Sequence, residues 1–262
     1  MWIYPRILAH RGGGTLAPEN TVAGLYYGMA AGFRAIEFDV MLARDGVPVV
    51  MHDPALGRTV RGSGNVFEHD AADLTQMDAG SWFGRAFAGE PVPLFTEFAA
   101  LCKAHGIWMN IEIKPAPGFD VETGATVARI AAALFKDELA AGDLARAPLL
   151  SSFSDAALAA ARQAAPGVPR ASLISSLGDD WEARARAVDA VAIHTNHLHL
   201  SQEQAREVKA RGFGLFCYTV NDPGRADELL SWGVDAFCTD RIDLIRPDTV
   251  VNIGHGKKTL AG

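Results

Sequence analysis

The chain has 262 residues, of which 49% are apolar, and its formal net charge is −7. This length and apolar content are sufficient for a full core and lie within the range of an α/β barrel built from one domain. The mildly acidic balance argues against nucleic acid or an anionic membrane as the main partner, but it says little about an anionic small molecule, whose binding depends on local charge.

The beginning of the chain, MWIYPRILAHRG, has neither the basic segment nor the apolar run of a signal peptide. No stretch has the length and apolar character of a membrane span. Three cysteines lie within apolar patterns, namely Cys102, Cys217 and Cys238. Such sparse cysteines indicate reduced, buried thiols, so we expect a cytoplasmic protein without stable membrane association. The sequence leaves the oligomeric state open.

Eight mostly apolar segments alternate with helical patterns along the chain and are predicted to be strands. Eight such units in a chain of this length favour a closed (β/α)8 TIM barrel over an open doubly wound sheet. The alternative lacks support because HRGGG does not have the spacing of a dinucleotide-binding turn. The predicted strands are 6–10, 35–40, 108–114, 149–153, 170–175, 190–194, 215–220 and 235–240.

The predicted helices have recognisable ends. Glycines that suit the left-handed conformation follow four of them, at Gly32, Gly106, Gly212 and Gly233. Three helix starts are predicted from capping residues: Thr96, Ser201 with Gln204, and Asp222 before Pro223.

One region departs from this rhythm. An extra strand is predicted within VPVVMHD, and residues from about 54 to 93 then run through turns and short segments. A connection of this length is usually functional, and on a barrel it would form an insertion over the mouth. We therefore expect one barrel domain over 1–262, with an insertion at about 54–93 and an irregular tail from about 248.

Two acidic residues share one face of the predicted strand RAIEFDV. Glu37 and Asp39 lie about 6–7 Å apart along the strand, where repulsion and burial disfavour both charges. The segment NIEIK repeats the pattern with Glu112 and Lys114. Because the strands of a barrel end at one mouth, three carboxylates without cysteine predict a site for Mg²⁺ or Ca²⁺. The alternative is a salt-bridge network with Lys114, Arg11 and Arg34.

Two histidines flank this predicted metal site. His10 ends the first strand and His52 ends the extra strand, as expected of a general acid and base, with a structural role as the alternative. Glu19 in the APENT turn and Asp53 beside His52 are placed to orient the imidazoles, or else to serve helix-start and turn chemistry. A rival zinc site within HTNHLH would use His194, His197 and His199.

Five segments in this order, HRGGGTLAPENT, IEFDVMLARDGVPVVMHD, NIEIKP, YTVNDP and GVDAFCTD, are similar to bacterial glycerophosphodiester phosphodiesterases. The resemblance covers nearly the whole chain and is greatest to the cytosolic members linked to glycerol-3-phosphate uptake. It implies a barrel with an insertion after the second strand and one divalent cation. It assigns the cation to Glu37, Asp39 and Glu112, the acid and base to His10 and His52, and the phosphate to Arg11 and Lys114.

The implied reaction is metal-dependent hydrolysis of glycerophosphodiesters to sn-glycerol 3-phosphate and an alcohol. His52 is assigned as the acid, and the attacking group is water or the glycerol hydroxyl of the substrate. Phe153 and Tyr218 are assigned to the substrate, and Tyr218 stands where similar proteins often have Trp. One alternative is a lysophospholipase D or cyclising lyase at the same site, and lipid substrates would be favoured by an exposed patch of Trp82, Phe83 and Phe87. The other is a catalytically silent phosphate-binding protein.

Overall fold

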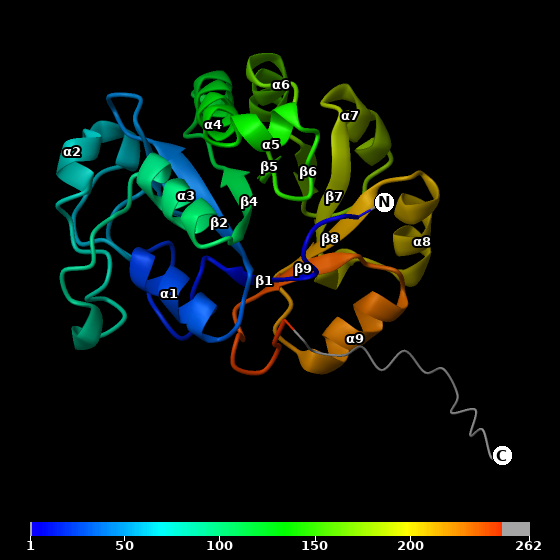
Figure 1. Ribbon diagram of the computed structural model, residues 1–262, viewed down its shortest axis with the longest axis horizontal. Coiled ribbons are helices and arrows are strands. Elements are labelled where there is room, and N and C mark those ends of the chain that lie inside the picture. Colours follow the sequence, from blue (N-terminus) through cyan, green and yellow to red (C-terminus); the bar gives the residue numbers. More distant parts are fainter. Residues whose placement is uncertain (1, 248–262) are drawn as a thin grey trace.

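The computed structural model describes residues 2–247, in which eight parallel strands close into a barrel (Figure 1). Closure follows from β1 (Ile7–His10), which pairs with both β2 (Ala35–Leu42) and β9 (Ala236–Thr239). The other barrel strands are β4 (Trp108–Ile113), β5 (Leu149–Ser152), β6 (Arg170–Ile174), β7 (Ala190–Asn196) and β8 (Gly214–Tyr218). The predicted (β/α)8 barrel is confirmed, and the predicted tail lies outside the described residues.

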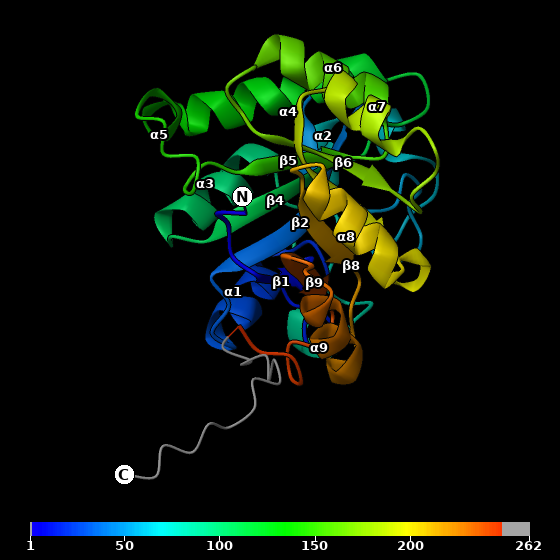
Figure 2. The ribbon, with the colours of Figure 1, turned by 90° about the vertical axis from the view of Figure 1, so that its right-hand side faces the viewer.

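Helices surround the barrel on its outer side (Figure 2). They are α1 (Val22–Ala30), α3 (Phe95–Ala104), α4 (Asp120–Leu134), α5 (Lys136–Ala140), α6 (Asp155–Ala164), α7 (Trp181–Ala187), α8 (Gln202–Ala210) and α9 (Pro223–Ser231), whereas α2 (Ala71–Leu74) lies in the insertion. The largest apolar cluster joins their inner faces to the outward-facing strand residues, such as Phe38, Ile111 and Leu215. This shell fixes the strands, so that their inward-facing side chains can be polar. No helix within 2–247 is long and apolar enough to cross a membrane.

The helix ends largely agree with prediction. The four glycines after helices have φ of 94°, 65°, 88° and 95°. Ser201 and Gln204 form a capping box, and the Asp222 side chain caps α9 before Pro223. The cap predicted at Thr96 is wrong, because α3 begins at Phe95. The reason is packing: Phe95 is fully buried against Phe38, with 6.2 Å between ring centroids, and this contact draws it into the helix.

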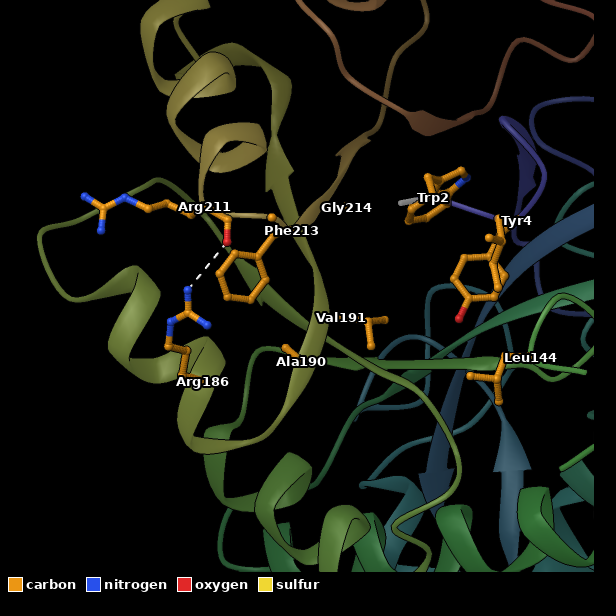
Figure 3. A pocket seen from close by; sticks show the side chains of 11 residues that line it. Trp2, Tyr4, Leu144, Arg186, Ala190, Val191, Arg211, Phe213 and Gly214 are labelled. Carbon is orange, nitrogen blue, oxygen red and sulfur yellow. Dashed lines mark hydrogen bonds between the residues drawn. The ribbon is translucent and has the colours of Figure 1, made fainter. Parts of the chain in front are cut away.

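An apolar layer closes the barrel interior at the N-terminal ends of the strands. It contains Leu8, Ala35, Trp108, Leu149, Ala171, Ala192 and Ala236. Trp2 and Tyr4 lie beneath this layer, beside a cavity of about 360 Å³ that opens at the same end and is shown in Figure 3. Arg186 and Phe213 border that cavity too, and their cation–π contact of 5.1 Å belongs to the helix packing. In TIM barrels this end serves stability, so we turn to the opposite end.

The insertion forms a lobe beside the second strand. β3 (Pro48–Val50) pairs antiparallel with β2, and the chain then runs through η1 (Val66–Glu68), α2 and η2 (Arg85–Phe87) before α3. The lobe has a small apolar cluster of its own, which includes Val60, Leu74 and Val92. The three cysteines of the chain are buried and free, as predicted.

Candidate active site

Three carboxylates converge at the C-terminal mouth of the barrel. Glu37 and Asp39 point inward from β2, and Glu112 lies beside Asp39 on the neighbouring β4. One oxygen from each side chain lies within 4.8 Å of the others, and Glu37 and Asp39 are only 4% and 1% exposed. Within 2–247 this is the one group of acidic, histidine or cysteine side chains arranged to hold a metal ion. The alternation of acidic and apolar residues in the segments RAIEFDV and NIEIK predicted this group of carboxylates.

The three carboxylates differ in their proton affinity. Burial and the charges of Asp39 and Glu112 raise the pKa of Glu37 well above its usual range. Burial, reinforced by Asp39, raises the pKa of Glu112 to about 8. Burial also acts on Asp39, but the positive charges of Arg11 and Lys114 outweigh it and lower the pKa of that carboxyl. Three ionised carboxylates therefore require an additional positive charge here, and hard oxygen donors suit Mg²⁺ or Ca²⁺.

Asp39 is the carboxylate with the most partners. Its Oδ2 accepts a hydrogen bond of 2.8 Å from Asn20 Nδ2 and lies 3.5 Å from Arg11 Nε. Lys114 Nζ lies 3.7 Å from Asp39 Oδ1 and 3.8 Å from Glu112 Oε1. The salt-bridge alternative is thus present in part. Its third member, Arg34, is exposed at the other end of β2, beside a separate cavity.

A backbone turn brings Arg11 and Asn20 to Asp39. Both residues have positive φ, of 51° and 57°, in the connection between β1 and α1. This conformation is uncommon for residues other than glycine, so the turn is held by its contacts. Asn20 was not predicted from the sequence, where it lies between Glu19 and the helix-capping Thr21 in the APENT segment. Its hydrogen bond to a residue 19 positions away appears only once the barrel has formed.

His10 is held by a carboxylate from the last barrel strand. Its Nδ1 lies 2.5 Å from Asp240 Oδ1, and its Nε2 lies 3.6 Å from Glu37 Oε2. Asp240 in turn accepts from Asn221 Nδ2 at 2.9 Å. A carboxylate at Nδ1 fixes the proton there and leaves Nε2 facing the carboxylate cluster. The sequence placed Asp240 at a strand end but gave no indication of its partner.

His52 has an equivalent arrangement in the insertion. Its Nδ1 lies 2.6 Å from Asp53 Oδ1, and the other Asp53 oxygen accepts from Arg58 Nε. Burial opposes ionisation of Asp53, but hydrogen bonds from Arg58 and His52 outweigh it and lower its pKa to about 2. Burial lowers the pKa of His52, which favours the neutral imidazole at neutral pH.

Glu19 does not orient an imidazole, contrary to expectation. Its carboxylate accepts from Arg11 Nη1 at 2.7 Å and from Arg58 Nη1 and Nη2 at 2.8 and 2.7 Å. The reason is its position on the β1–α1 connection, where the guanidinium groups of Arg11 and Arg58 occupy both carboxylate oxygens. Arg58, which the sequence analysis did not single out, thus joins Glu19 to Asp53. A chain of polar contacts therefore connects His52 to Asp39. Its intermediate members are Asp53, Arg58, Glu19 and Arg11.

One cavity of about 190 Å³ brings most of these residues together. Its wall includes His10, Arg11, Glu37, His52, Glu112, Lys114, Phe153 and Tyr218. Phe153, 46% exposed, meets the edge of the Tyr218 ring at 5.9 Å, so these two aromatic rings form the rim. Asp39 lies behind this wall, as do Glu19 and Asp53.

The rival zinc site does not form. His194 lies inside the barrel and stacks on Phe216 at 4.4 Å, whereas His197 and His199 belong to the short helix η3 (His197–His199) beyond the strand end. His197 is engaged by Arg225, whose Nε lies 3.4 Å from His197 Nδ1. Strand alternation and the turn after it separate the three rings, so they form no metal-binding group among the described residues.

A (β/α)8 barrel with acids, cations and carboxylate-held imidazoles at its mouth is typical of a hydrolase that acts on anionic esters. Residues 10–244 match the model of the glycerophosphoryl diester phosphodiesterase family. The chain is 30% identical to a glycerophosphodiester phosphodiesterase of Caldanaerobacter subterraneus subsp. tengcongensis, over 94% of this chain and 96% of that one. It is 31% identical to one from Bacillus subtilis, over 90% and 84%.

Solved structures agree. A phosphodiesterase of Oleispira antarctica, in complex with the product sn-glycerol-3-phosphate, has a TM-score of 0.81 and 33% identity, over 90% of this chain and 93% of that one. A glycerophosphodiester phosphodiesterase of Agrobacterium tumefaciens has a TM-score of 0.74 and 26% identity, over 91% and 97%. The chain belongs to the glycerophosphoryl diester phosphodiesterase family and is a phosphodiesterase.

Proposed function

We propose that the chain hydrolyses glycerophosphodiesters to sn-glycerol 3-phosphate and an alcohol, with a divalent cation as cofactor and the two histidines as acid and base. The observation that carries this proposal is one cavity lined by Glu37, Glu112, two basic side chains and both imidazoles, with Asp39 grouped with the two glutamates. The product bound in the Oleispira antarctica phosphodiesterase supports the choice of substrate.

The cation would be held by Glu37, Asp39 and Glu112. Their buried oxygens fit Mg²⁺ and Ca²⁺ alike, and the raised pKa of two of them indicates a site that needs positive charge. When bound, the cation supplies charge that stabilises the phosphoryl oxygens. Arg11 and Lys114, whose side chains are 17% and 21% exposed, would add to this stabilisation from the cavity wall.

We assign His52 as the acid and His10 as the base. The His10 side chain is the more enclosed, at 16% exposure against 29% for His52, and its Nε2 faces the carboxylate cluster. His52 lies on the insertion side of the mouth, where a departing alcohol would leave the cavity. Proton transfers of this kind contribute about 10²–10⁴-fold to the rate. The attacking oxygen is that of water, or that of the substrate's glycerol through a cyclic phosphate.

Deacylated substrates suit this cavity better than lipids. Trp82, at 40% exposure, packs against Phe83 with 5.6 Å between ring centroids, but this aromatic patch does not line the cavity. The cavity is small, and most of the residues that line it carry polar or charged groups. A silent phosphate-binding protein would not require two imidazoles that are each held by a carboxylate.

The test is release of sn-glycerol 3-phosphate from glycerophosphocholine, with Mg²⁺, with Ca²⁺ and with a chelator. We expect release with at least one cation and none in the chelator. Full activity in the chelator, or no release with any divalent cation, would contradict the proposal. Lysophosphatidylcholine assayed in parallel distinguishes a lysophospholipase D. Phosphorus NMR of the products distinguishes a lyase, since a cyclic phosphate would then accumulate.

A further inference from the structure

Three polar side chains lie inside the barrel beside the carboxylates, and nothing in the proposed chemistry uses them. Asn110 on β4, Ser151 on β5 and His194 on β7 are 2%, 0% and 1% exposed. The Oδ1 of Asn110, the Oγ of Ser151 and both ring nitrogens of His194 have no hydrogen-bond partner in the described chain. All three side chains border the active-site cavity, and we call them the polar floor.

The polar floor is the closed end of this cavity. Asn110 is paired in register with Glu37, and Ser151 with Glu112, so the floor lies directly beside the carboxylates. One inward-facing position further down each strand begins the apolar layer, with Trp108, Leu149 and Ala192. A ligand group that reaches the floor therefore has no exit beyond it and must be small.

Polar floor residues are unusual in this position. The interior of a TIM barrel is generally filled by branched apolar side chains, and native proteins leave few buried polar atoms without a partner. Each such atom has lost its hydrogen bonds to water on burial and makes none with the protein in their place. Their side chains therefore indicate an occupant of the cavity that completes the hydrogen bonds.

The chemistry of the polar floor is that of a hydroxyl-binding surface. Burial lowers the pKa of His194 to about 3, so its ring is neutral and offers one donor and one acceptor. Ser151 Oγ can donate and accept, and Asn110 Oδ1 accepts. The upper cavity wall carries the charges, and the rim is aromatic. The cavity thus changes from charged to uncharged with depth, where Leu173 and Phe216 lie beside His194, and this mixed lining suits a phosphate that bears a small polyol.

We propose that the polar floor binds the hydroxyl groups of the glycerol moiety, while the alcohol moiety of the substrate lies at the Phe153–Tyr218 rim. This inference rests on the proposed function, and it names Ser151, Asn110 and His194 as residues that determine specificity for glycerol. It predicts that the site distinguishes glycerol 3-phosphate from a phosphate of equal length without hydroxyls.

The experiment measures the affinity of the cation-loaded protein for sn-glycerol 3-phosphate and for propyl phosphate by calorimetry. The wild type is expected to prefer the glycerol ester. Ser151→Ala, Asn110→Leu and His194→Phe should each reduce the ratio of the two affinities by about 2- to 10-fold, the effect of one neutral hydrogen bond. Affinity for propyl phosphate should stay the same. Circular dichroism checks the fold of each variant, and Ser151→Ala removes only one oxygen.

Thr195→Val is the matched control. Thr195 Oγ1 is also buried without a partner, but this residue follows His194 on β7 and does not border the cavity. Its ratio should equal that of the wild type. An unchanged ratio in all three floor variants would mean that the floor holds ordered water only, and would overturn the inference.

The two proposals fail in different ways. If glycerophosphocholine is not hydrolysed while the ratio still depends on the floor, the proposed function is wrong and the glycerol site stands. If hydrolysis occurs while the floor variants behave like Thr195→Val, only the glycerol site is wrong. A wild type that binds both phosphates equally also contradicts the glycerol site.

Discussion

Among individual residues, Glu112 shows how one carboxylate serves two opposed requirements. Under the proposed function it helps to hold a cation, but without one its charge would lie buried beside that of Asp39. Burial and Asp39 raise its pKa to about 8, so the folded protein retains a proton that the unfolded chain loses near pH 4.5. The stability associated with that proton is present at low pH and is lost as the pH rises from about 4.5 to about 8.

Glu112→Gln should therefore have opposite effects on cation binding and on stability. We expect at least a tenfold weaker affinity for the cation, because the amide carries no charge. In chelator at pH 9, the free energy of unfolding should rise by about 1–3 kcal/mol, because a buried charge is removed. Calorimetry and urea denaturation measure the two quantities. Unchanged cation affinity would remove Glu112 from the site.

His52→Ala tests the proposed acid and leaves the carboxylate cluster in place. We expect turnover of glycerophosphocholine to fall by at least about 10²-fold, since an acid is lost from the transition state. Cation affinity should persist, because His52 is not part of the carboxylate cluster. His105→Ala, at an exposed position after α3, is the control and should keep wild-type turnover. Loss of cation binding in His52→Ala would make this residue a ligand.

At this scale, the sequence predicted the side chains that face the mouth but not what holds them. Strand alternation is local, so it identified Glu37, Asp39 and Glu112 from two short segments. The contact between His10 and Asp240 spans 230 positions, and it depends on barrel closure. Glu19 illustrates the same limit, because its guanidinium partners come from different connections.

Among the structural elements, the insertion and the β1–α1 connection are joined by Arg58. Its guanidinium group contacts Glu19 and Asp53, which would otherwise be two carboxylates without a shared partner. Asp53 holds His52, and Glu19 holds Arg11, so Arg58 supports the proposed acid and a proposed phosphate-binding side chain together. It is a positioning residue, since it does not border the cavity.

Arg58→Ala should lower kcat for glycerophosphocholine by about tenfold and also raise KM, because both His52 and Arg11 lose part of their support. Stability should change by less than about 1 kcal/mol, because the Arg58 side chain is 46% exposed and such ion pairs contribute little. Arg61→Ala, at an exposed position of the same loop, is the control. Kinetics that match this control would contradict a positioning role.

The elements themselves were largely predictable. All eight barrel strands and the capping box at Ser201 follow from local patterns of apolar residues, glycines and capping side chains. The start of α3 did not follow, because Phe95 enters the helix through a contact with Phe38 on another element. Packing between distant segments overrides capping preference in such cases.

For the whole molecule, His194 links stability to pH. Burial lowers its pKa to about 3, against 6.5 for the unfolded chain. Its contribution is complete above about pH 6.5, and it is lost as the pH falls from 6.5 towards 3, because the unfolded state alone then binds the proton. The wild type should lose unfolding free energy between pH 7.5 and pH 5.5, and this loss should be about 1.4 kcal/mol smaller in His194→Phe. Urea denaturation at both values checks this, and equal losses would contradict it.

Cation binding should also be visible in the stability of the whole molecule. A ligand present at one hundred times its Kd stabilises the folded state by about 2.7 kcal/mol, which is about 5–11 °C in Tm for a domain of this size. We expect this increase with the cation that supports hydrolysis, and reversal by chelator. Glu112→Gln at the same cation concentration should show a smaller shift. An equal shift in both proteins would place the cation elsewhere.

The pairing of β1 with β9 has a consequence for how the enzyme is made. The partner of His10, Asp240, follows the last barrel strand in the described chain, 230 positions further on. A ribosome therefore adds 230 residues after His10 before this histidine can be oriented. We expect the growing polypeptide to stay inactive toward its substrate until the barrel closes.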